Sequence, residues 1–141
     1  QARLKQYLEI RSMDACSWNL IGSQPAFWVG ILYDDQIMDK VSEITQGWTE
    51  EDRQYLNKRV PEEGLQTKFK QKKLIEFAQI FYELAKKGLI KRNRLSKNGE
   101  YDETINMKDL EINLSNGHST ADCLINKCKT TREQSTKPIY E

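Results

Sequence analysis

Residues 3 to 11 alternate in polarity with a period of two. One face of this segment is apolar except for Gln6, and the other is polar and mostly charged, carrying Arg3, Lys5, Tyr7, Glu9 and Arg11. A period of two is typical of a β-strand whose two faces differ in polarity. We therefore predict one strand over residues 4 to 11, with Glu9 and Arg11 on the same face.

Everything after this strand is predicted to be helix or loop. Amphipathic spacing, capping patterns and the positions of glycine and proline set the expected boundaries. Pro61 is expected to end the third helix, and Gly64 to allow the turn that follows. The expected helices cover residues 25–34, 34–46, 49–58, 70–87, 104–115 and 119–128.

The strongest helical pattern covers residues 70–87 and carries one broad apolar stripe. We predict that it is the longest or nearly the longest helix, with Phe77, Phe81 and Leu84 buried. Gly88 follows the stripe at the position where a helix C-cap is expected. One strand followed by about six helices places the chain in the α+β class.

The composition is that of a globular protein and excludes several classes of function. Hydrophobic residues make up 38% of the chain and charged residues 30%. A net charge of +1 gives no field that would attract nucleic acid or an anionic membrane. Apolar runs are far shorter than the roughly 20 residues of a membrane helix, and no signal peptide is evident, so we predict a cytoplasmic protein. Trp18, Trp28 and Trp48 are expected in the core, and residues 68–73 at a solvated helix start.

Cysteine and histidine offer little for metal binding or cross-linking. The three cysteines, Cys16, Cys123 and Cys128, are odd in number and form no CxxC pair. They predict reduced thiols, not a disulfide scaffold or a zinc site. His118, the single histidine, is expected in a loop before a helix.

Several motifs resemble those of glutamate–cysteine ligases of the plant and proteobacterial type. Residues 7–35, YLEIRSMDACSWNLIGSQPAFWVGILYDD, are similar to a family pattern of YLE-x-R-GAD, a tryptophan, and LPAFWVGLLYD. Further along, GWTEEDR, RVPEEGLQT, AKKGLIKR and SNGHSTAD match family motifs in the same order. The resemblance spans about residues 3 to 128.

This resemblance implies the C-terminal part of a glutamine-synthetase-like fold. Residues 1–12 would be one strand of the active-site antiparallel sheet, residues 13–128 a helical C-terminal region, and residues 129–141 a flexible tail. The implied reaction is the ATP-dependent ligation of the γ-carboxylate of L-glutamate, through an acyl phosphate, to L-cysteine. That reaction is the first step of glutathione synthesis.

The resemblance also implies roles for the charged strand. Glu9 would be a Mg²⁺ ligand, and Arg11 would contact the phosphoryl group transferred from ATP. Arg3 and Lys5 could bind phosphate or a substrate carboxylate, or could form structural salt bridges instead. Magnesium prefers carboxylate and phosphate oxygens, and a guanidinium matches phosphate geometry. Taken without the resemblance, such a charged face is more often a solvated surface.

The chain starts at Gln1 and enters the strand pattern at once, which we interpret as a truncated start. The expected partners are therefore glutamate, cysteine, ATP and a missing N-terminal part of the same polypeptide, without which we predict no activity. Gly22 replaces a redox-regulatory cysteine of the plant enzymes, so disulfide regulation of that kind is not expected. Two alternatives remain: another carboxylate–amine ligase of this fold, such as that of ergothioneine synthesis, and a non-catalytic helical adaptor.

Overall fold

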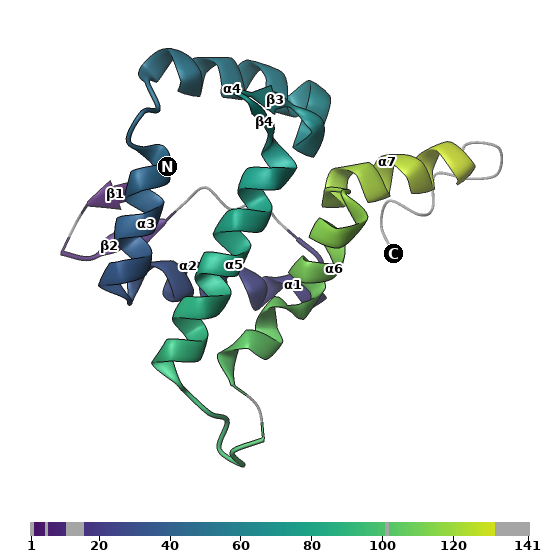
Figure 1. The fold of residues 1–141 in the computed structure, drawn as a ribbon. Helices are drawn as coiled ribbons and strands as arrows, with labels where there is room; N and C mark the ends of the chain where they lie inside the picture. The colour runs from purple at the N-terminus through teal and green to yellow at the C-terminus, as the bar shows by residue number, and fades with distance from the viewer. Residues whose placement is uncertain (1, 5, 11–15, 101, 132–141) are drawn as a thin grey trace.

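The computed structural model describes residues 2–4, 6–10, 16–100 and 102–131. These residues are mostly helical, and α5 lies between α2 and α3 on one side and α6 on the other (Figure 1). The elements are β1 (Ala2–Leu4), β2 (Leu8–Ile10), α1 (Trp18–Ile21), α2 (Ser23–Leu32), α3 (Asp35–Thr45), α4 (Glu50–Glu63), the 3₁₀ turn η1 (Gly64–Gln66), β3 (Lys68–Phe69), β4 (Lys72–Lys73), α5 (Leu74–Arg92), the 3₁₀ turn η2 (Glu103–Met107), α6 (Lys108–Asn116) and α7 (Thr120–Thr131).

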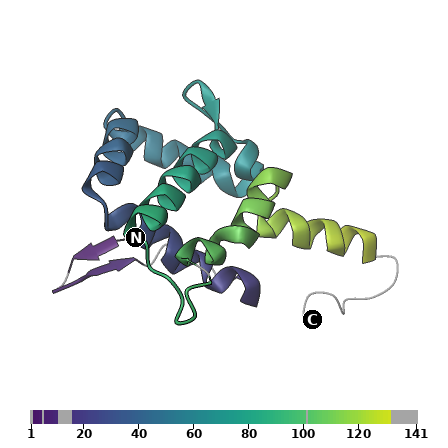
Figure 2. The same cartoon turned by 60° about the horizontal axis from the view of Figure 1, so that its bottom comes forward.

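The N-terminal segment forms a short hairpin where the sequence predicted one strand over residues 4 to 11. Strands β1 and β2 pair antiparallel, with Arg3 opposite Glu9, and the chain bends at Gln6 and Tyr7. The prediction of a single strand was wrong. A strand needs a neighbour for its backbone donors and acceptors, and here the chain supplies one by folding back on itself. The hairpin lies at the edge of the molecule, beside the helical part (Figure 2).

Helix α5 confirms the strongest prediction but ends later than expected. It spans Leu74–Arg92 and, with 19 residues, is the longest helix in the described part of the chain. Gly88, the predicted C-cap, lies inside the helix, which is capped by Asn93 in the left-handed conformation (φ 49°). Asparagine adopts this conformation more readily than most other non-glycine residues, so it can take the place of the expected glycine.

Helix α4 begins as predicted and continues past its predicted end. Thr49 and Asp52 form the expected capping box, with each side chain accepting a backbone N–H of the other residue. Pro61 lies in the last turn of α4 and does not end it. Proline donates no backbone hydrogen bond and its ring crowds the preceding turn, yet α4 stops only at Gly64, three residues later, whose φ of 56° leaves the helical region.

Residues 68–73 form the hairpin β3–β4, which corrects the predicted helix start. The hairpin is fixed by burial of Phe69, whose ring packs edge-on against Trp48 with centroids 5.0 Å apart. Phe77 and Phe81 complete this aromatic cluster. Trp48 and Trp28 are half-buried, whereas Trp18 is 83% exposed, so its predicted place in the core was wrong.

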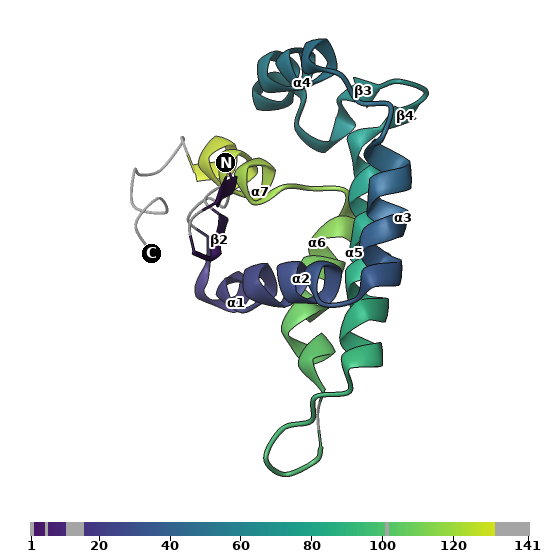
Figure 3. The same cartoon turned by 90° about the vertical axis from the view of Figure 1, so that its left-hand side faces the viewer.

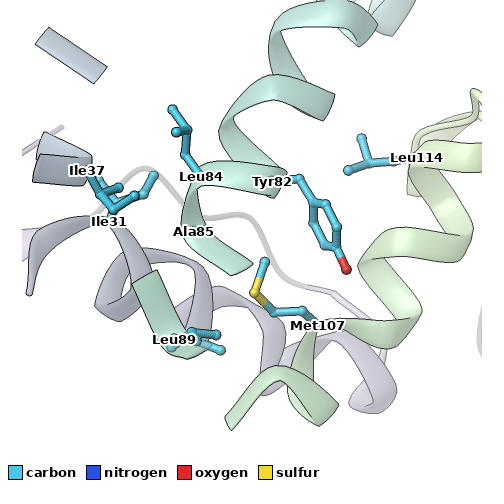
Figure 4. Close-up of a cluster of buried hydrophobic side chains, with 9 residues drawn as sticks. Ile31, Ile37, Tyr82, Leu84, Ala85, Leu89, Met107 and Leu114 are labelled. Atoms are coloured by element: carbon cyan, nitrogen blue, oxygen red, sulfur yellow. The ribbon is translucent and has the colours of Figure 1, made fainter. Parts of the chain in front are cut away.

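The main core lies where α2, α3, α5 and the η2–α6 segment meet. Leu84 is buried as predicted, whereas Phe77 and Phe81 are only half-buried. Figure 3 shows α2 crossing α5 and α3 at a steep angle, so the core is built on crossed rather than parallel helices. Figure 4 shows its side chains, which include Ile31, Ile37, Tyr82, Leu84, Ala85, Leu89, Met107 and Leu114.

Candidate active site

The predicted site residues fall on the N-terminal hairpin. Arg3 on β1 and Glu9 on β2 are brought together as directly opposed partners of the antiparallel pair, and Glu9 is half-buried. Lys5 and Arg11 lie outside the described residues. The shared face of Glu9 and Arg11 therefore stays a prediction, while the pairing of Arg3 with Glu9 is a relationship that a single strand could not have provided.

The side-chain chemistry of this hairpin is compatible with one ligand of a magnesium site. Magnesium is commonly held by one or two carboxylates together with substrate phosphates, and Glu9 supplies one carboxylate. Among the residues that the structure describes, no group of three aspartate, glutamate, histidine or cysteine side chains is arranged to hold a metal ion. Glu9 would therefore act with phosphate oxygens and with ligands from elsewhere.

A second polar cluster, which the sequence did not reveal, links α5 to α6. The Lys86 ammonium donates to Glu111 Oε1 at 3.0 Å, and the Tyr82 hydroxyl donates to the same carboxylate. Burial, with help from Glu111, raises the pKa of Tyr82 to about 12. Tyr82 and Lys86 stand four residues apart, but Glu111 is 25 residues beyond Lys86, so only the folded chain brings the three together.

Two cysteines lie within the part of the chain that the structure describes at side-chain level. Cys16 is half-buried and Cys123 is exposed, and both are free thiols, as the sequence predicted. His118 is exposed in the short link before α7, as expected. No helix of the described residues is long and apolar enough to cross a membrane.

Comparison with known proteins bears directly on these observations. The family model described as "Glutamate-cysteine ligase family 2" matches residues 1–141, and therefore every motif and every proposed site residue. The chain belongs to glutamate–cysteine ligase family 2. The resemblance inferred from the motifs is confirmed.

The relatives to which this chain is compared come from plants. The chain is 33% identical to "Glutamate--cysteine ligase A, chloroplastic" of Oryza sativa subsp. indica and 36% identical to "Glutamate--cysteine ligase, chloroplastic" of Solanum lycopersicum, over all of its 141 residues. Over 92 residues, or 65% of the chain, it is 44% identical to the Medicago truncatula protein of the same name, covering 18% of that protein. The chain spans 27% of the rice protein and 26% of the tomato protein. Their names place these relatives in the chloroplast, and a cytoplasmic location for this chain stays a prediction.

In this family member, two of the matching motifs meet at one helix crossing. Gly30 of the WVG motif touches Gly88 of the AKKGLIKR motif, backbone against backbone. Beside them, Lys91 pairs with Asp34 at 3.2 Å, and the Arg92 guanidinium lies 4.9 Å from the centre of the Tyr33 ring. These motif residues hold α2, α3 and α5 together, so they have a structural role in the described part of the chain.

A second motif pair meets at the start of α7. The turn at Gly64, from the RVPEEGLQT motif, lies beside Asp122 from the SNGHSTAD motif. Asp122 and Ser119 form a reciprocal cap: Ser119 donates from its backbone and its hydroxyl, at 2.8 and 2.7 Å, and accepts the Asp122 N–H at 3.1 Å. The hydrogen bonds from Ser119 lower the pKa of Asp122. Here too the motif residues organise the fold, which leaves the N-terminal hairpin as the part with catalytic candidates.

Proposed function

We propose that this chain is part of an enzyme that ligates L-glutamate, through its γ-carboxylate, to L-cysteine at the expense of ATP, the first step of glutathione synthesis. The observation that carries the proposal is the family match over the whole chain, including the YLEIR segment. The names of the relatives support glutamate–cysteine ligation over the ergothioneine-type ligase and over an adaptor.

In this proposal the site residues act on the phosphoryl group and its metal. Glu9 contributes a carboxylate to Mg²⁺, which neutralises charge on the transferring phosphoryl group. Arg11 binds the same group through its planar fork, which stays protonated at working pH. If both side chains share one face of a strand, they stand roughly 6.6 Å apart, from a rise of ~3.3 Å per residue. Arg3 and Lys5 bind phosphate or a substrate carboxylate.

The remaining parts of the site would come from outside these residues. The relatives are nearly four times as long as the chain, so room exists for an adenine pocket, further metal carboxylates and the glutamate and cysteine sites. We propose that the complete enzyme has a glutamine-synthetase-like sheet to which the YLEIR segment adds a C-terminal strand. In that sheet the segment would exchange its hairpin partner, β1, for neighbouring strands.

Substitution of Glu9 tests the proposal most directly. In a ligase polypeptide that contains this chain, Glu9→Gln removes the charge and keeps the shape, so formation of ADP and γ-glutamylcysteine should fall by at least about 100-fold and recover in part at high Mg²⁺. Glu43→Gln, at an exposed position of α3, is the control and should keep normal turnover. Normal turnover of Glu9→Gln at ordinary Mg²⁺ would remove Glu9 from the metal site.

Arg11 is tested by a change that keeps its charge. Arg11→Lys replaces a planar fork by a point charge, so we expect a loss of kcat of roughly 100-fold, with the KM for glutamate much less affected. Arg94→Lys, in the exposed loop after α5, is the matched control. An Arg11→Lys variant as active as Arg94→Lys would argue that Arg11 makes no contact with the phosphoryl group.

A further inference from the structure

Helices α1, α2, α5, α6 and α7 surround a cavity of about 690 Å³. The cavity lies next to the core, and its lining includes Leu124 of α7, a residue that is 48% exposed. Small-molecule sites in proteins typically have volumes of about 300–1,000 Å³. The cavity is therefore large enough for a ligand of ordinary size and not merely a packing defect.

The walls of the cavity have a distinct chemistry. Four aromatic rings line it, those of Phe27, Trp28, Phe81 and Tyr82, and leucine side chains supply much of the remaining wall. None of the lining residues is aspartate, glutamate, lysine or arginine. Such a wall favours apolar and aromatic groups and opposes charge, because a buried charge without a partner is costly.

Most of the polar side chains of the wall already have partners within the fold. The Ser23 hydroxyl donates to the Asn106 carbonyl oxygen at 2.7 Å, and the Ser119 hydroxyl belongs to the cap of α7. The Tyr82 hydroxyl is held by Glu111. A ligand would therefore gain mostly from burial of apolar surface.

We propose that this cavity binds a small, uncharged molecule with an aromatic or branched apolar body and few polar atoms. Neither Arg3 nor Glu9 is among the lining residues. The inference goes beyond the proposed ligase function and does not depend on it, because binding can be measured without turnover.

Binding of the neutral fluorophore N-phenyl-1-naphthylamine to the 141-residue chain tests the proposal. We expect a saturable rise in fluorescence with one site per chain. Two competitors with the same ring system, one neutral and one charged, then test the chemistry of the wall. 1-Naphthalenemethanol should displace the probe, and 1-naphthoate should bind at least tenfold more weakly because its carboxylate would have to enter an uncharged cavity.

Variants on α7 locate the site. Leu124→Glu places a charge on the wall and should weaken probe binding at least tenfold, whereas Ile125→Glu should leave it within twofold. Ile125 is the matched control, because it is 51% exposed on the same helix and is not among the lining residues. Ala121→Trp, at an exposed lining position, should also block binding by filling space. Circular dichroism checks that the variants fold.

Four results would overturn the proposal. The first is equal weakening by Leu124→Glu and Ile125→Glu, and the second is equal displacement of the probe by the alcohol and the carboxylate, a comparison that needs no variant. The third is loss of the probe site when the chain is extended to the length of its relatives, which would show that polypeptide fills the cavity. Dimerisation that excludes the probe would likewise assign the cavity to an interface between copies.

Discussion

Gly30 of α2 and Gly88 of α5 place their backbones in direct contact at the crossing of the two helices. A Cβ atom on Gly88 would overlap the carbonyl oxygen of Gly30, and a Cβ atom on Gly30 would overlap the carbonyl oxygen of Ala85. The obstacle in each case is backbone and not a flexible side chain. The two helices can approach this closely only because both positions lack a side chain.

Gly30→Ala or Gly88→Ala should therefore destabilise the chain strongly. Overpacking commonly costs about 1–3 kcal/mol, and we expect about 3 kcal/mol or more here because the helices must move apart. Urea unfolding followed by circular dichroism measures the change. Gly47→Ala is the control: no atom lies within 4 Å of its Cβ position, so stability should change by less than about 1 kcal/mol. Equal effects at Gly47 and Gly88 would contradict the close approach.

Tyr82 should make stability depend on pH in the alkaline range. Its pKa is about 12 in the folded chain, mainly through burial and then through Glu111, against about 10 when unfolded. The folded state holds the proton more tightly, so the stabilisation is complete below pH 10 and is lost as pH rises towards 12 and above. The loss should be roughly 2–3 kcal/mol, at 1.36 kcal/mol per unit of pKa.

Tyr82→Phe separates this effect from the titration of other groups. The difference in unfolding free energy between the wild type and Tyr82→Phe should shrink between pH 10 and pH 12. Lys86, whose pKa is raised chiefly by its hydrogen bond to Glu111 and to a smaller extent by Tyr82, remains in both proteins. Tyr33→Phe, at a 72% exposed position, is the control. A difference that stays constant with pH would show that Tyr82 does not carry the effect.

Asp52 should contribute stability that is lost in acid. The Lys70 ammonium, 2.7 Å away, and the Thr49 N–H lower the pKa of this carboxyl below its usual value. Because the folded pKa is the lower one, the stabilisation is present above about pH 3.9 and is lost as pH falls through the folded pKa. At pH 7 thermal melting should show a lower Tm for Asp52→Asn.

The acid dependence of this difference distinguishes the ion pair from loss of packing. The gap in Tm between wild type and Asp52→Asn should close only as pH falls through the folded pKa of Asp52, which lies below its usual value, because both side chains are then neutral. Asp39→Asn, at an exposed position of α3, should match the wild type throughout. A gap that persists in strong acid would mean that Asp52 acts by shape and not by charge.

The sequence predicted the helices better than the way in which they end and pack. The stripe of α5 is a local pattern, and the helix expected over residues 104–115 ends within one residue of the end of α6, whose C-cap Gly117 has a φ of 68°. Gly88 was assigned to a cap because a glycine after an apolar stripe usually ends a helix. Its actual role depends on Gly30, 58 positions earlier, and only the folded chain brings the two together.

The predictions for residues 68–73 and for Trp18 were wrong for a similar reason. The lysines of the β3–β4 hairpin follow no helical or strand period, and the hairpin is fixed by contact of Phe69 with Trp48, which is distant in sequence. Trp18 was placed in the core by residue type alone, and its exposure depends on what packs against α1. At the candidate site, the alternation of residues 3 to 11 correctly indicated strand structure. It did not reveal the turn that pairs Arg3 with Glu9.

The 141-residue chain by itself should have no ligase activity. Formation of an acyl phosphate needs an adenine pocket, several metal ligands and a glutamate site that converge on one centre. The described residues contain no group of three metal-binding side chains, and Glu9 supplies a single carboxylate. Incubation of the purified chain with ATP, Mg²⁺, glutamate and cysteine should therefore yield neither ADP nor γ-glutamylcysteine. Turnover that disappears in Glu9→Gln would contradict this expectation, and activity regained on adding the remaining part of the ligase in trans would support it.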